Sequence, residues 1–161
     1  MNILIAVFIL LAYTVVMIYL IGKVPPSLSE SVFWLPKKYQ FIWALVLFAV
    51  CFLCVPTYVE RCSENTRFLA FLSIAGLAFV GAAPLVKWKE DPMQFNVHQW
   101  GAIVCAVCSQ LVLVFNQPWL LLCWVPWVLA FVWFSKDGPW KEIIFWSEAV
   151  CFASTFAFCL I

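Results

Sequence analysis

The stretch from Thr66 to Gln110 reads TRFLAFLSIAGLAFVGAAPLVKWKEDPMQFNVHQWGAIVCAVCSQ. It divides into an apolar run (Thr66–Val86), a short charged segment (Lys87–Val97) and a second apolar run opened by the only histidine, His98. A helix rises about 1.5 Å per residue, so about 20 apolar residues cross the hydrocarbon core of a bilayer. The stretch therefore predicts two membrane-spanning helices joined by a charged loop, around which the rest of the chain packs.

The composition also indicates a membrane protein. The chain has 161 residues, of which 66% are hydrophobic and 11% charged. A soluble domain is about 45–50% apolar and about 25% charged, and one of this size leaves much of its surface in water. We therefore predict a single membrane domain over residues 1–161. The net charge of +1 gives no reason to expect nucleic-acid binding.

The remaining apolar runs predict four further spans, and the fold class is an all-α, polytopic bundle of six transmembrane helices. The predicted spans are Asn2–Gly22, Gln40–Tyr58, Thr66–Val86, His98–Phe115, Trp119–Phe134 and Trp140–Ile161. The first is expected to be retained, because it is too long for a signal peptide and has no basic residue before it. Pro56 is expected to kink or end the second span, and Pro126 to kink the fifth.

The distribution of basic residues predicts the orientation in the cell membrane. Cytoplasmic loops carry the excess of Lys and Arg. One side of the predicted bundle carries seven lysines, and the other carries only Arg61 and Arg67. The lysines are Lys23, Lys37, Lys38, Lys87, Lys89, Lys136 and Lys141. We predict that loops 23–39, 87–97 and 135–141 are cytoplasmic and that both termini lie outside.

Small residues recur every four positions in the fourth span, which lets helices approach closely in lipid. One ridge is Gly101, Cys105 and Ser109, and a second is His98, Ala102, Ala106 and Gln110. Both are suited to face the third span. Gln110 has two interpretations: it hydrogen-bonds a neighbouring helix, or it lies along an alanine-walled ligand groove.

A few polar residues are candidates for binding a ligand or an ion. Glu148 lies in the sixth predicted span, where a charged side chain is costly and by default indicates function. His98 can titrate, ligate a metal or hold a lipid headgroup. We predict a polar cluster of His98, Gln110 and Glu148, with Ser29 and Glu30 at its cytoplasmic rim. The alternatives are structural: Glu148 fastens two helices together, and His98 is an interfacial hydrogen-bonding residue.

The eight cysteines are interpreted as packing residues, because seven lie in apolar runs and buried cysteine behaves as a small hydrophobe. Only Cys62 falls in a predicted loop. The pairs Cys51/Cys54 and Cys105/Cys108 have redox spacing, but apolar surroundings within a helix make thiols inert. A catalytic zinc needs three protein ligands, and the chain has a single histidine. We predict no metal, no other cofactor and no catalytic residue.

Three short motifs resemble those of the Frag/DRAM/Sfk group of six-span membrane proteins and its bacterial relatives of unknown function. They are Ser27-Leu28-Ser29-Glu30, the run from Gly76 to Pro84, and His98-Gln99-Trp100-Gly101-Ala102. The resemblance implies a six-helix bundle and no defined activity. A histidine at the start of a span is also similar to membrane-embedded zinc hydrolases of the ceramidase type, but those use several histidines.

Three functions follow as hypotheses. The first is a non-enzymatic membrane protein that binds lipid or a small apolar ligand, or serves as a membrane subunit, with a homo-oligomer as one form of assembly. The second is an oligomeric channel or transporter that uses Glu148 as a proton or cation site. The third is an enzyme acting on lipid, with His98 and a carboxylate as acid and base.

Overall fold

The structure, a computed structural model, describes residues 2–82, 92–135 and 140–161. Every regular element in these residues is a helix. The α-helices are α1 (Asn2–Ile21), α2 (Phe41–Arg61), α3 (Arg67–Ala82), α4 (Pro92–Asn116), α5 (Trp124–Phe134) and α6 (Ile143–Leu160). The short 3₁₀ helices are η1 (Glu30–Trp34), η2 (Lys37–Tyr39), η3 (Glu64–Thr66) and η5 (Pro118–Cys123).

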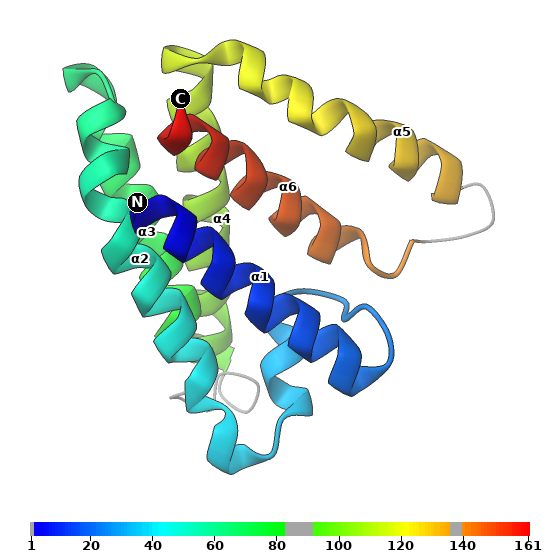
Figure 1. Cartoon of the computed structure of the whole chain (residues 1–161). Helices are drawn as coiled ribbons and strands as arrows, with labels where there is room; N and C mark the ends of the chain where they lie inside the picture. The colour runs from blue at the N-terminus through cyan, green and yellow to red at the C-terminus, as the bar shows by residue number, and fades with distance from the viewer. Residues whose placement is uncertain (1, 83–91, 136–139) are drawn as a thin grey trace.

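The helices run alternately up and down and form two sets (Figure 1). The steep helices α2, α3 and α4 stand side by side, and α1, α6 and α5 cross them in a shared tilted direction. The first residues of α1 and the last of α6 lie toward the same end of the bundle. The segment between α1 and α2 lies at the opposite end.

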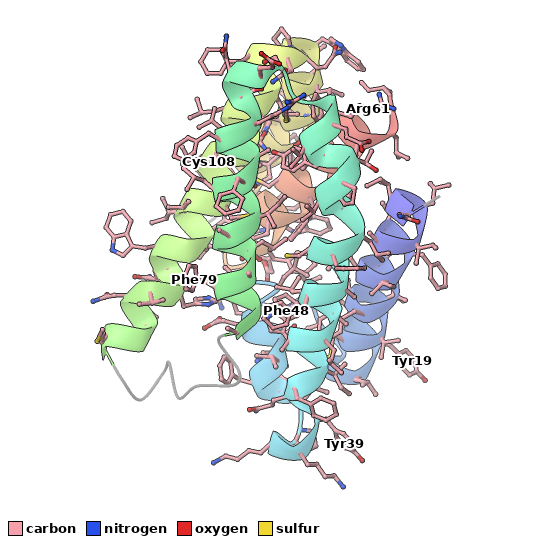
Figure 2. All side chains as sticks on the ribbon, turned by 90° about the vertical axis from the view of Figure 1, so that its left-hand side faces the viewer. Tyr19, Tyr39, Phe48, Arg61, Phe79 and Cys108 are labelled. Atoms are coloured by element: carbon pink, nitrogen blue, oxygen red, sulfur yellow. The ribbon has the colours of Figure 1, made fainter. Side chains whose placement is uncertain are left out.

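Five helical segments of the described chain are long and apolar enough to cross a membrane, judged by length and composition. Only about 28–33% of each candidate span is buried within the bundle. Large apolar side chains instead point outward, including Phe8 (72% exposed), Tyr19 (84%) and Phe52 (81%). Figure 2 shows Tyr19 directed away from the helices. Such a surface is favourable in lipid and unfavourable in water.

Several predicted helix boundaries are wrong. The fourth helix begins at Pro92 rather than His98, because proline at the first helical position is already in helical geometry and no breaker follows it. The second continues through Pro56 to Arg61, so this proline does not end it. The sixth begins at Ile143 rather than Trp140. Residues 83–91 and 136–139, which include the end of the third predicted span and parts of two predicted Lys-bearing loops, lie outside the described residues.

The predicted fifth span is not one α-helix. It starts as the 3₁₀ helix η5 and becomes α-helical at Trp124, so Pro126 falls in the first turn of α5. In a continuous α-helix the carbonyl of Leu122 would need an N–H from Pro126, which proline lacks. The N–H of Trp124 donates to that carbonyl instead. The proline therefore sets where α-helical geometry begins.

The helices α3 and α4 approach most closely at two glycines. A Cβ atom added to Gly76 would lie 2.5 Å from the carbonyl oxygen of Gly101 and 2.8 Å from the backbone nitrogen of Cys105. The Ser73 hydroxyl also donates to the carbonyl of Cys105 over 3.2 Å. The predicted packing of Gly101 and Cys105 against the third span is thus confirmed.

The second predicted ridge of α4 faces elsewhere. Ala102 and Ala106 line an internal cavity, and Gln110 points toward α6 and Trp124. The expectation that this ridge also faces the third span is therefore wrong. Successive small-residue ridges lie on different sides of one helix, and only one of them meets α3.

Candidate functional site

A cavity of about 350 Å³ lies between α2, α3, α4 and α6. Small-molecule pockets usually measure about 300–1,000 Å³, so this volume is at the small end of that range. Its lining is mostly apolar. Among the apolar lining residues are Leu47, Val50, Leu77, Ile103, Phe152 and Phe156.

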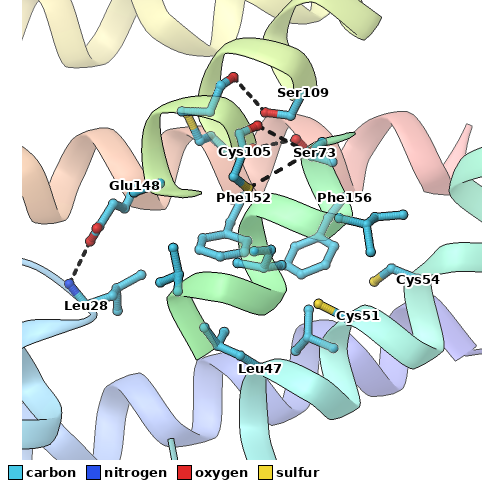
Figure 3. A pocket seen from close by; sticks show the side chains of 18 of the residues that line it. Leu28, Leu47, Cys51, Cys54, Ser73, Cys105, Ser109, Glu148, Phe152 and Phe156 are labelled. Carbon is cyan, nitrogen blue, oxygen red and sulfur yellow. Dashed lines mark hydrogen bonds between the residues drawn. The ribbon is translucent and has the colours of Figure 1, made fainter. Parts of the chain in front are cut away.

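The cavity is elongated along α6. Glu148 and Cys159 both line it, and the eleven helical steps from one to the other correspond to about 16 Å. Figure 3 shows Glu148 at one end and Cys54 at the other, with Phe152 and Phe156 between them. The end of the cavity at Glu148 is thus acidic, and the lining of the rest of the cavity is mostly apolar.

The segment between α1 and α2 closes the acidic end. Gly22, at φ +74°, ends α1 in a left-handed conformation that glycine adopts without strain. The chain then turns inward, and Ser27, Leu28, Ser29 and Ser31 are all buried. The hydroxyl oxygen of Ser27 accepts the N–H of Glu30 at 3.0 Å, whereas Ser29 makes no side-chain cap.

Hydrogen bonds to α1 and α6 fix this segment. Tyr13 and Ser31 join hydroxyl to hydroxyl over 3.0 Å. The N–H of Phe145 donates to the carbonyl of Pro26 at 3.0 Å. The N–H of Leu28 donates to the Glu148 carboxylate at 2.6 Å (Figure 3). Glu148 is therefore held at the point where the segment meets α6.

Glu148 is half-buried and lines the cavity, so it is accessible from inside the bundle. The predicted rim residues lie beside it. Ser29 also lines the cavity, and Glu30 is close enough to interact electrostatically with both Glu148 and His98. His98 is itself buried, at 7% exposed. Of the five predicted residues, Glu148 and Ser29 therefore line one end of the cavity, and Glu30 lies within electrostatic range of both Glu148 and His98.

Gln110 is the predicted site residue that does not join them. It donates to the hydroxyl of Ser154 at 3.3 Å and accepts the indole N–H of Trp124 at 2.9 Å. These bonds connect α4 with α6 and with the start of α5. Of its two interpretations, the hydrogen-bonding link between helices is the one that the structure shows.

Tyr58 was not among the predicted site residues. It is 2% exposed and lines the cavity on α2, and its hydroxyl has no hydrogen-bond partner of acceptable geometry among the described residues. The nearby Ser73 hydroxyl, which donates to the Cys105 carbonyl, also acts on the Tyr58 hydroxyl. Leaving a buried polar group unpaired costs about 1–3 kcal/mol. Helical periodicity places Tyr58 on the same face of α2 as Cys51 and Cys54, and this is the sequence pattern that indicates its position at the cavity.

Five of the eight cysteines line the cavity, namely Cys51, Cys54, Cys105, Cys151 and Cys159. All eight fall in the described residues and all are free thiols. In the described part of the chain no group of three or more His, Cys, Asp or Glu side chains is placed to hold a metal ion.

Cys62, which falls in a predicted loop, is 3% exposed. It follows the last residue of α2, and burial raises the pKa of its thiol. The turn around it is fixed by Asn116, which accepts the N–H of Ser63 at 2.9 Å and donates to Thr66 at 2.9 Å. The predicted position of Cys62 outside the helices is therefore confirmed, and its side chain is buried.

The fold and the site together define a helical protein with several helices able to cross a membrane and an internal, mostly apolar cavity with an acidic end. Comparison with protein-family models, with curated proteins and with solved structures found no match to this chain.

Proposed function

We propose that this chain is an integral membrane protein that crosses the bilayer six times and holds a lipid chain or another small amphiphile within its helices. The cavity of about 350 Å³ is the observation that carries the proposal. Its apolar length suits a hydrocarbon chain, and its acidic end suits a polar head.

One of the six proposed crossings, the fifth in chain order, consists of η5 and α5 together. A 3₁₀ helix rises about 2.0 Å per residue and an α-helix about 1.5 Å. With 6 residues in η5 and 11 in α5, the segment reaches about 28 Å, close to the roughly 30 Å of a hydrocarbon core. None of the residues of α5 is buried in the bundle, which suits a helix surrounded by lipid.

The orientation and the family resemblance form part of the same proposal. With six crossings, the Lys-bearing loops 23–39, 87–97 and 135–141 lie on the cytoplasmic side, and the acidic end of the cavity lies nearer that side. The residues that resemble the Frag/DRAM/Sfk group support this reading. Leu28 and Ser29 of the first motif border the cavity, and Gly76 and Gly101 make the α3–α4 contact.

The test is to fill the cavity and look for loss of a bound molecule. Ala106 lines the cavity, whereas the adjacent Val107 is 51% exposed on the outer surface. We expect purified wild-type protein and the Val107→Trp control to retain a stoichiometric amphiphile, detected by native mass spectrometry and solvent extraction. Ala106→Trp should lose it. A wild-type protein that retains nothing, or equal retention in both variants, contradicts the proposal.

A further inference from the structure

We infer that the occupant of the cavity carries an ammonium group that binds Glu148 and a single alkyl chain that extends along α6 toward Cys159. This inference rests on the proposed function, because it needs a cavity that takes a ligand. It adds the chemical class of that ligand.

The surroundings of Glu148 point to a positively charged head. The only hydrogen bond that the described residues give to its carboxylate comes from Leu28, on one oxygen. No lysine or arginine among them forms an ion pair with it, and the charged side chain that acts on it, Glu30, has the same sign. A carboxylate has about four acceptor positions, and an ammonium group supplies three donors and the opposite charge. Buried charges are unfavourable unless they are paired.

The rest of the cavity points to a single chain. The path of about 16 Å from Glu148 to Cys159 is bordered by the apolar side chains of Phe152 and Phe156. The volume is at the small end of ligand pockets, which favours one alkyl chain over two.

Tyr58 provides an independent sign that the cavity takes a ligand. It lines the same cavity from α2 and is almost fully buried, and its hydroxyl is unpaired among the described residues. A hydroxyl of this kind can bind a second polar group of the occupant.

The experiment uses the full chain in lipid nanodiscs and a long-chain alkylamine that carries a photoreactive diazirine on its chain. Cross-links are mapped by mass spectrometry, and dodecylamine, dodecanol and dodecanoate are added as competitors. We expect cross-links on cavity residues of α2 and α6. Dodecylamine should compete at a concentration about tenfold lower than dodecanol, because hydrogen bonds between charged groups are stronger than neutral ones. Dodecanoate should compete least.

Variants test the role of the carboxylate. Glu148→Gln should abolish the preference for dodecylamine over dodecanol, and Glu148→Asp should keep it. Glu60→Gln removes an exposed carboxylate at the end of α2 and is the matched control, which should behave as wild type. Lysophosphatidylethanolamine as a further competitor distinguishes the two sources of the head: stronger competition than dodecylamine indicates an aminophospholipid, and weaker competition a free amine.

The outcomes separate the two proposals. Equal competition by dodecylamine and dodecanol in the wild-type protein overturns the ammonium inference and leaves the apolar cavity as a binding site. Absence of cross-links on cavity residues overturns both. The competition series on the wild-type protein tests the ammonium inference even if Glu148→Gln does not fold.

Discussion

The contact between Gly76 and Gly101 predicts that a single methyl group will destabilise the bundle. In Gly76→Ala the new Cβ would lie 2.5 Å from the carbonyl oxygen of Gly101, whereas ordinary contacts of a Cβ atom begin at 3.4 Å. The atoms it meets belong to the backbone of α4, so the helix as a whole must move away by about 1 Å. This displacement also breaks the 3.2 Å hydrogen bond from Ser73 to the Cys105 carbonyl.

The magnitude follows from three contributions. Overpacking costs about 1–3 kcal/mol, and the lost hydrogen bond costs about 0.5–1.5 kcal/mol. Alanine in place of glycine returns about 1 kcal/mol of helix propensity. We therefore expect Gly76→Ala to lower the free energy of unfolding by about 1–3 kcal/mol.

The assay is reversible unfolding by sodium dodecyl sulfate in mixed micelles, followed by circular dichroism. Gly81→Ala is the control, because the three atoms nearest its added Cβ all belong to the side chain of Leu47. Its effect should be smaller, since one side chain adjusts more easily than a helix backbone. If Gly76→Ala proves as stable as wild type, or Gly81→Ala costs more, the close backbone contact does not exist.

Two further predictions concern Tyr58 and Cys62. Tyr58→Phe removes an unpaired buried hydroxyl, so it should raise the free energy of unfolding of ligand-free protein by about 1 kcal/mol in the same assay; a loss of stability would show that the hydroxyl is bonded. Burial raises the pKa of the Cys62 thiol, and only the thiolate is nucleophilic. Maleimide labelling of Cys62 should therefore be slower at pH 7 than labelling of an exposed Glu64→Cys, and should accelerate as the pH rises; equal rates at pH 7 would contradict the burial of Cys62.

The helical fold was predictable because its signal is local. Long apolar runs form helices in lipid, where every backbone N–H and carbonyl must be bonded within the segment. The boundaries were less predictable. His98 marks a change in polarity, but a helix begins where the backbone permits, and here that is Pro92.

The site was predictable in part for the same reason. A carboxylate within a predicted span by itself indicates a candidate site, and Glu148 does line the cavity. Its partner was not predictable, because the N–H of Leu28 is 120 residues away in the sequence and belongs to a segment expected at the membrane surface. The burial of that segment depends on tertiary contacts with α1 and α6, which no local pattern reveals. Tyr58 was missed because an aromatic residue in a span resembles many others.

The touching backbones of α3 and α4 also restrict how a molecule could enter the bundle. The two helices cannot slide or separate without losing the close backbone contact at Gly76 and Gly101, so we expect them to move as one unit. The opposite wall is α6, tied to its neighbours by a few hydrogen bonds, including those from Leu28 and to Gln110. If a molecule occupies the cavity as proposed, we therefore expect α6 and the buried segment before α2 to adjust around it, while the contact between Gly76 and Gly101 stays unchanged.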